Sequence, residues 1–313
     1  MQKKKYEKIV VEKILKKSEL PEEFKQLEKR NIHYEYISEL INYNHFQLMK
    51  DNLYVPSEVI LAEITDVDHE NVEDYLFSGH YRNLVSNHFA KEAVRMKKEH
   101  GIPVGISYLN IVGKLQNDTL RNSLLYNRAK NDIFFTEDLD LYFNTFMTVS
   151  TNEKQKKEIV RNFEHLKTLL PGNPSPQFVN YENSKGGVAS LSDLRGKYVY
   201  IDIWATWCGP CIAEIPALKK LERKFQDKNI EFLSISVDNK KDKDKWKKMI
   251  KEKKLGGIQL FADNSFNSNF IKSYYIIGIP KFILLDPNGN IVDSNAPAPS
   301  QPQLEDLLTS LDL

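Results

Sequence analysis

The sequence predicts two domains of different fold class, an all-helical domain over residues 1–170 and an α/β domain over residues 171–313, whose central mixed sheet is covered by helices on both faces. In the first part, apolar residues recur at helical spacing. In the second part, short apolar and β-branched runs alternate with amphipathic segments. The stretch LLPGNPSPQF, residues 169–178, lies between the two patterns, and its prolines and glycine are typical of a linker.

The helices of the first part are predicted by apolar residues three or four positions apart. These residues are Phe24, Leu27, Tyr36, Leu40, Tyr43, Leu48, Leu84, Val85, Phe89, Ala93 and Met96. Gly101 and Pro103 follow a basic segment and are expected to end a helix there. Further helices are expected over residues 117–134, 137–149 and 152–170. The sequence indicates no role for this domain.

The second part predicts strand, helix, strand, helix, hairpin and helix in that order. The runs KYVYIDIWA and IEFLSISVD are expected to be buried strands, and PALKKLERKF and KWKKMIKEKK to be helices. In KFILLDPNGNIVDS, the turn residues Asp286 to Gly289 separate two apolar runs, which predicts a hairpin. Residues 303–313 can form a closing helix. This order predicts one sheet with helices on both of its faces.

Charge and composition exclude several classes of protein. The 313 residues carry a formal net charge of +1, so no bulk electrostatic attraction to nucleic acid or to an anionic membrane is expected. No apolar run reaches the roughly 18 residues of a membrane helix. Charged residues also interrupt the opening MQKKKYEKIVVEKILKK, where a signal peptide would be apolar. We therefore expect either a cytoplasmic protein or one whose leader or membrane tether lies outside this sequence.

Both cysteines lie in WATWCGPCIAEIP, where a predicted strand gives way to a helix. Two cysteines are too few for a disulfide-stapled scaffold, so the pair is expected to be reactive. Cys208 should lie at the helix N-terminus, where unpaired N–H groups and the helix dipole stabilise a thiolate, and Pro210 suits the first helical turn. Cys211, one turn later, is near enough to close a disulfide. Cys208 is therefore the expected exposed nucleophile and Cys211 the more buried resolving thiol, and the expected reaction is thiolate attack on a disulfide sulfur.

Metal-based interpretations of the pair fit the sequence less well. Covalent haem attachment requires a histidine directly after the second cysteine, and Ile212 occupies that position. A structural zinc site needs four ligands, but the chain has no third cysteine and all seven histidines precede residue 166. An inert structural disulfide is a further alternative. Redox chemistry without a metal is the interpretation that the spacing favours.

The segment DIWATWCGPC resembles the active site of thioredoxin, and the chain from about Gly172 onward resembles the TlpA/ResA-like thiol-disulfide oxidoreductases. The motifs that carry the resemblance occur in order as GNPSPQF, LSDLRGKYVYIDIWATWCGPCIAEIPALKKL, FLSISVD and YYIIGIPKFILLDPNGNIV. The resemblance implies a thioredoxin-like fold, protein disulfide substrates, a thiol electron donor and no cofactor. It also implies a site of action outside the cytoplasmic membrane, periplasmic or in the cell envelope.

The resemblance further implies roles for individual residues. Asp202 matches the buried acid that moves protons to and from the resolving thiol, and Glu214 matches a glutamate that tunes the acidity of the cysteines. Glu214 also suits the first helical turn for its charge alone, and this alternative stays open. Ile279 and Pro280 match the cis-proline segment that offers its backbone to a bound peptide. The residues expected to form the rest of the substrate-binding surface are Trp207, Gly209 and Pro210.

This sequence departs from the family pattern at three positions. Ser234 stands where thioredoxin has a lysine near the buried aspartate, and Lys281 follows the proline where threonine is common. Many membrane-anchored relatives have asparagine at the position of Asp202, so the direction of electron flow stays open. Glycine and proline between the cysteines, as in thioredoxin, favour a reductase.

Two other functions are compatible with the sequence. Related domains act as thiol peroxidases through a cysteine sulfenate, although a resolving cysteine three residues away disfavours that chemistry here. The helical domain could instead bind client proteins in a chaperone-like way, with an incidental redox site.

Overall fold

The computed structural model describes residues 2–51 and 53–313. The chain divides into two compact units, one ending at Phe163 and the other spanning Glu164–Leu313. The division lies within the last helix of the first unit, upstream of the linker-like stretch at residues 169–178.

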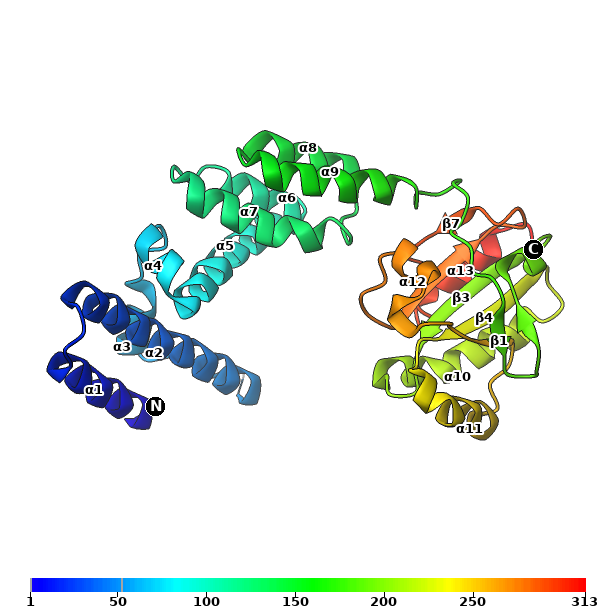
Figure 1. Cartoon of the computed structure of the whole chain (residues 1–313), viewed down its shortest axis with the longest axis horizontal. Coiled ribbons are helices and arrows are strands. Elements are labelled where there is room, and N and C mark those ends of the chain that lie inside the picture. The colour runs from blue at the N-terminus through cyan, green and yellow to red at the C-terminus, as the bar shows by residue number, and fades with distance from the viewer. Residues whose placement is uncertain (1, 52) are drawn as a thin grey trace. The chain divides into compact units, whose positions relative to one another are not determined.

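Helices joined by loops make up the part of the first unit that the structure describes, and no strand occurs in that part, as predicted (Figure 1). Its helices are α1 (Gln2–Lys17), α2 (Glu22–Lys50), α3 (Glu58–Thr65), α4 (Val72–Phe77), α5 (Gly79–His100), α6 (Val104–Val112), α7 (Asp118–Asp132), α8 (Leu139–Val149) and α9 (Glu153–Lys167). The predicted helix end at Gly101 is confirmed, because this residue caps α5 in the left-handed conformation, with φ of 72°. Side chains of Asn71, Ser78 and Asn117 accept backbone N–H groups at the starts of α4, α5 and α7.

The predicted apolar positions supply part of the core of this unit, and the prediction is wrong for Phe24, Tyr43 and Leu48, which are 38% to 44% exposed. Ile37, which was not predicted, is also in the core. Ile37 and Leu40 of α2 and Val85 and Ala93 of α5 are each at most 1% exposed. Burial of this apolar surface supplies most of the stability of short helices, which are marginal when isolated.

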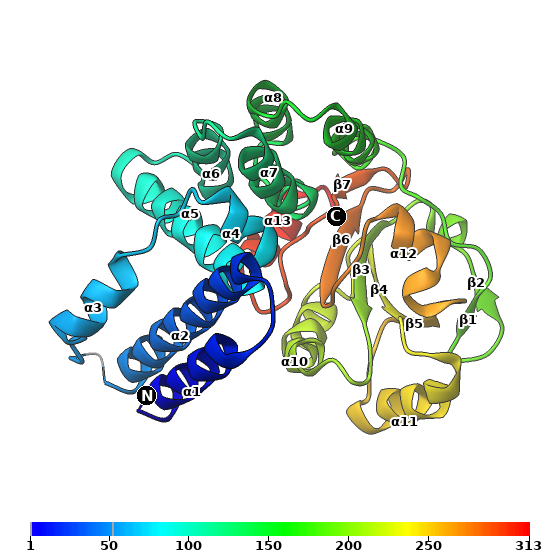
Figure 2. The ribbon, with the colours of Figure 1, turned by 60° about the vertical axis from the view of Figure 1, so that its left-hand side comes forward.

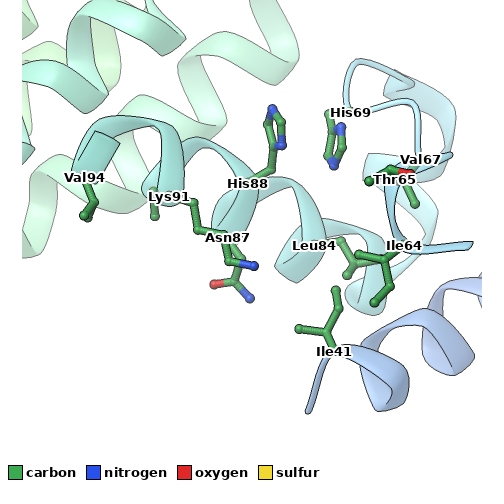
Figure 3. Close-up of a pocket in the computed structure, with 11 residues that line it drawn as sticks. Ile41, Ile64, Thr65, Val67, His69, Leu84, Asn87, His88, Lys91 and Val94 are labelled. Carbon is green, nitrogen blue, oxygen red and sulfur yellow. The ribbon is translucent and has the colours of Figure 1, made fainter. Parts of the chain in front are cut away.

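A cavity of about 540 Å³ opens in the first unit between α2, α5 and the loop after α3 (Figure 3). Its walls are mainly apolar, with Ile41 and Leu84 among them. His69 of the loop stacks on His88 of α5, with ring centroids 3.8 Å apart. Burial, with a smaller contribution from the neighbouring His88, lowers the pKa of His69.

The second unit contains one mixed sheet in the order β2-β1-β5-β4-β3-β6-β7. Its strands are β1 (Tyr181–Asn183), β2 (Val188–Ala189), β3 (Tyr198–Trp204), β4 (Ile230–Ser236), β5 (Ile258–Phe261), β6 (Lys281–Leu285) and β7 (Ile291–Asp293). Strands β3, β4 and β5 are parallel, whereas β6 pairs antiparallel with β3 and β7 antiparallel with β6. The predicted hairpin is therefore confirmed as β6 and β7.

Helices cover both faces of this sheet, as predicted (Figure 2). The helices are α10 (Gly209–Lys224), α11 (Lys243–Lys253), α12 (Asn269–Ser273) and α13 (Pro302–Ser310), with short 3₁₀ turns at Leu191–Leu194, Lys240–Asp242 and Ser265–Asn267. Alternate residues of β3 face opposite layers. Tyr200 packs in the cluster that contains residues of α10 and α13, and Ile201 in the cluster that contains residues of α11 and α12. Asp202 lies two residues after Tyr200, so it interrupts the apolar face of β3 that α10 covers.

Candidate active site

The two cysteines lie at the start of α10, directly after the turn that follows β3. Cys208 is the N-cap residue of the helix, and its Sγ is bonded to Sγ of Cys211. The N–H of Cys211 points to Sγ of Cys208 at 3.2 Å, and Pro210 occupies the first turn. Sulfur at this position faces unpaired N–H groups and the positive end of the helix dipole, which favour a thiolate once the disulfide opens.

The expectation that Cys208 would be exposed and Cys211 more buried is wrong for the disulfide form. Both residues are 4% exposed, and both belong to the apolar cluster that also holds Trp204. In this form Sγ of Cys208 is bonded to Sγ of Cys211 and accepts a hydrogen bond from the N–H of Cys211. The exposed side chain beside the disulfide is Trp207, which is 60% exposed.

The turn before Cys208 is held by Asp238, a residue that the sequence reasoning missed. Asp238 is fully buried and accepts hydrogen bonds from the N–H of Thr206 at 2.9 Å and from its Oγ1 at 2.8 Å. The Ser236 hydroxyl donates to the same carboxylate at 2.8 Å. The available signal was an aspartate directly after the apolar run FLSISV, at the edge of the sheet where β3 also ends.

Asp202 faces α10 from the middle of the sheet. It lies opposite Ser234 of β4 and Phe282 of β6 in the strand register. Burial raises the pKa of Asp202 to about 7, a hydrogen bond from Ser234 opposes that rise, and the negative charges of Glu214 and Glu222 add to it. A carboxyl group with this pKa can take up and release a proton near neutral pH.

Asp202 and Cys211 line the same small cavity beneath α10. Its volume is about 10 Å³, and Ser234, Glu222 and Gln259 also line it. Glu222 was not predicted as a site residue. Its signal was its position eleven residues after Cys211, which places both on the same face of a helix three turns apart.

Glu214 does not line this cavity but anchors the loop that leads into α13. Its two carboxylate oxygens accept hydrogen bonds from the N–H and the Oγ of Ser300, each at 2.8 Å. The alternative that Glu214 is a first-turn charge is wrong, because α10 begins at Gly209 and its first turn contains no acidic residue. The contact with Ser300 gives Glu214 a structural role, and its charge also raises the pKa of Asp202.

The Ile279–Pro280 peptide bond is cis. Lys281 lies opposite Ile203 in the register of β3 and β6, so Pro280 precedes β6 at the sheet edge where β3 ends and the turn to Cys208 begins. Burial lowers the pKa of Lys281, whose Nζ donates to Oδ1 of Asn295 at 2.8 Å. The Lys281 ammonium group is therefore tied to the loop after β7.

Two classes of feature are absent from the part of the chain that the structure describes. Over residues 2–51 and 53–313, three or more histidine, cysteine or acidic side chains nowhere converge as a metal site would require. None of the described helices is both long and apolar enough to cross a bilayer.

Comparison with known proteins supports the same chemistry. Residues 170–311 match the family model described as Redoxin. The thiol-disulfide oxidoreductase ResA of Bacillus thuringiensis subsp. konkukian is 28% identical over 140 residues, which cover 45% of this chain and 78% of that protein. ResA of Bacillus subtilis is 26% identical over 130 residues, covering 42% of this chain and 69% of that protein. The solved thioredoxin domain of a thiol-disulfide oxidoreductase from Bacteroides vulgatus is 32% identical to this chain, with a TM-score of 0.40. The match covers 45% of this chain and 96% of that domain. Residues 170–311 therefore match the redoxin family and are similar to the ResA thiol-disulfide oxidoreductases.

Proposed function

We propose that the chain reduces protein disulfides through the Cys208–Cys211 pair. The observation that carries this proposal is the disulfide at the N-terminus of α10, with Asp202 and Cys211 on the wall of one cavity. In the reduced form, the Cys208 thiolate attacks one sulfur of the client disulfide. A mixed disulfide forms between Cys208 and the client, and the second client sulfur leaves as a thiolate that takes a proton from water.

Cys211 completes the cycle with the help of Asp202. The Asp202 carboxylate takes the proton of the Cys211 thiol, and the resulting thiolate attacks Sγ of Cys208. The Cys208–Cys211 bond forms, and the first client sulfur leaves and is protonated. The client gains the two electrons that the cysteine pair loses, and its two thiolates take up two protons from water. The Cys211 proton, held by Asp202, returns to water, so the net uptake is one proton, which balances the one that Cys208 released when it ionised. A thiol donor must then reduce the pair again.

The client is proposed to bind beside the disulfide. Trp207 offers an exposed aromatic face, Gly209 and Pro210 are exposed on the first turn of α10, and the backbone of Ile279 and Pro280 can pair with an extended peptide. Ile277, 70% exposed in the same loop as Ile279, adds apolar surface for such a peptide.

The reduction potential of the pair tests the direction of electron flow. The oxidised protein is equilibrated with dithiothreitol or glutathione buffers, and Cys211→Ser is used to trap mixed disulfides. A strongly reducing potential together with trapped clients supports the reductase, and a high potential would point to an oxidase or isomerase. A pair that does not cycle would rule out the enzymatic function. Turnover of hydrogen peroxide would instead favour a thiol peroxidase.

A second candidate function, client binding by the helical unit, is favoured by exposed apolar side chains near the end of α2. Phe46, Met49, Leu53 and Val55 are between 52% and 83% exposed. Such residues can bind a partner. Cys208→Ser would leave client capture by this surface intact while abolishing exchange.

A location outside the cytoplasmic membrane forms part of the proposal, because TlpA/ResA-like proteins usually act there. Fractionation of cells that express the native gene tests it. Recovery of the protein in the cytoplasm alone would contradict it.

A further inference from the structure

We propose that Glu222 is a positioning residue that passes the proton of Asp202 to and from solvent. This inference rests on the proposed function, because it assigns the outer end of the proton path that the Cys211 step requires.

The placement of Glu222 comes from the face of α10. Cys211, Ile215, Leu218 and Glu222 recur at intervals of three and four residues, so all four lie on the side of the helix that faces the sheet. All four line the same cavity as Asp202. Glu222 is half-buried, whereas Cys211 is almost wholly buried. Glu222 therefore lies on the cavity wall at the end closer to solvent.

The backbone at Gly256 fits closely against the Glu222 carboxylate. A Cβ atom at position 256 would lie 2.3 Å from Oε2 of Glu222, which is closer than such atoms approach in proteins. Glycine at this position therefore lets the carboxylate occupy the cavity wall.

The charges that face Glu222 keep it able to exchange a proton. Burial raises the pKa of Glu222, and the positive charge of Lys219 opposes that rise. Lys219 lies one turn earlier on α10 and donates to the carbonyl oxygen of Lys253 at 2.9 Å. From β3, Asp202 faces the same cavity, and the negative charge of Glu214, also on α10, acts on Asp202. Asp202 and Glu222 are thus two acids near one cavity, and ionisation of one disfavours ionisation of the other.

The cavity that both acids line also has unpartnered polar atoms on its wall. Oε1 of Gln259 and Nε1 of Trp204 are buried and make no hydrogen bond to any residue that the structure describes. A volume of about 10 Å³ is close to that needed for one water molecule with polar partners. A water molecule held there can carry a proton between the two carboxyl groups.

The proposed path adds one transfer to the reaction. Once Asp202 has taken the Cys211 proton, Glu222 accepts it from Asp202, directly or through the cavity water, and releases it to solvent. Asp202 is then again a carboxylate, and no electrons move in this step. When a thiol donor reduces the disulfide, the same path runs inward and supplies the proton that Cys211 takes up.

The test compares Glu222→Gln with Glu252→Gln, an exposed carboxylate of α11 that serves as the charge-matched control. Disulfide formation in the reduced protein is followed by stopped-flow tryptophan fluorescence with insulin as client, and the titration of Asp202 by carboxyl carbon-13 NMR. In Glu222→Gln we expect about a tenfold slower step at pH 7 and an Asp202 midpoint at lower pH, because a neighbouring negative charge is removed. The control should match the wild type in both measurements.

Gly256→Ala provides a second variant without any change in titratable groups. Its methyl group displaces the Glu222 carboxylate. We therefore expect disulfide formation at pH 7 to be slowed as in Glu222→Gln, and the Asp202 midpoint to change. A wild-type rate in both variants, with or without a shifted midpoint, would overturn the relay. Absence of exchange in the wild-type protein would instead overturn the proposed function, and the Asp202 midpoint would still report whether Glu222 is coupled to it.

Discussion

The buried Asp202 carboxylate lowers the free energy of unfolding at neutral and alkaline pH. Its pKa is raised to about 7 mainly by burial, so the folded chain binds a proton between about pH 4 and pH 7 that the unfolded chain has already released. The free energy of unfolding therefore decreases as pH rises through this range. Asp202→Asn should be more stable than the wild type at pH 8, on the order of 4 kcal/mol, with the difference vanishing below about pH 4. Urea unfolding across this range measures the effect, and equal stability at pH 8 would contradict the burial of a charge.

Asp238 stabilises the fold, unlike Asp202, because its buried carboxylate accepts hydrogen bonds from Thr206 and Ser236. Replacement by alanine removes the acceptor for Thr206 N–H and Oγ1, and we expect a loss on the order of 3 kcal/mol in the free energy of unfolding. The reduction potential should also change, because Thr206 fixes the turn that carries Cys208. Asp244→Ala, at an exposed position of α11, is the matched control. A wild-type potential in Asp238→Ala would show that the turn is held by other contacts.

Among the elements, those with long and regular patterns were predictable from sequence. The strands β3 and β4 have seven residues each and are mainly apolar, and α5 ends at Gly101 as its basic last turn indicated. The sequence did not reveal β1, β2 or β5, since each has four residues or fewer and gains its strand character from pairing with a neighbour. The same limit applied to the site. The spacing of Cys208 and Cys211 is local in sequence and could be predicted. The role of Glu222 depends on its closeness to Gly256 and Asp202, which are distant in sequence and meet only in the fold.

The loop after α3 and helix α5 make the helical unit sensitive to acid. The pKa of His69 is lowered, first by burial and then by His88, so the unfolded chain binds more protons as pH falls below about 6.5. Stability that is present above pH 6.5 is therefore lost as pH falls toward the folded pKa of His69. His69→Phe keeps a ring on His88 but cannot titrate, and we expect thermal unfolding of the helical unit to be less dependent on pH between 5 and 7. The negative charge of Asp68 favours the charged form of His69 and opposes part of this effect. If His69→Phe unfolds with the same pH dependence as the wild type, groups other than His69 cause that dependence.

At the scale of the whole molecule, the boundary between the two domains stays a prediction that fragments can test. The sequence pattern favours a boundary at residue 170, but residues 164–170 also contribute to the second unit. Leu169 is 4% exposed in the core cluster around the disulfide, Leu166 packs against the same cluster, and Nε2 of His165 lies 2.8 Å from the carbonyl oxygen of Ser273.

A fragment of residues 164–313 should therefore be more stable than one of residues 171–313 by about 3 kcal/mol, because the shorter fragment loses burial of two leucine side chains. Chemical unfolding of both fragments measures the difference. In the full chain, Leu169→Ala should reproduce most of the loss, whereas Leu170→Ala, at a position 39% exposed, should have little effect. Equal stability of the two fragments would place the boundary at residue 170. Both fragments keep every residue of the disulfide site, so their reduction potentials should agree, and a difference would show that residues 164–170 act on the cysteines through the shared core.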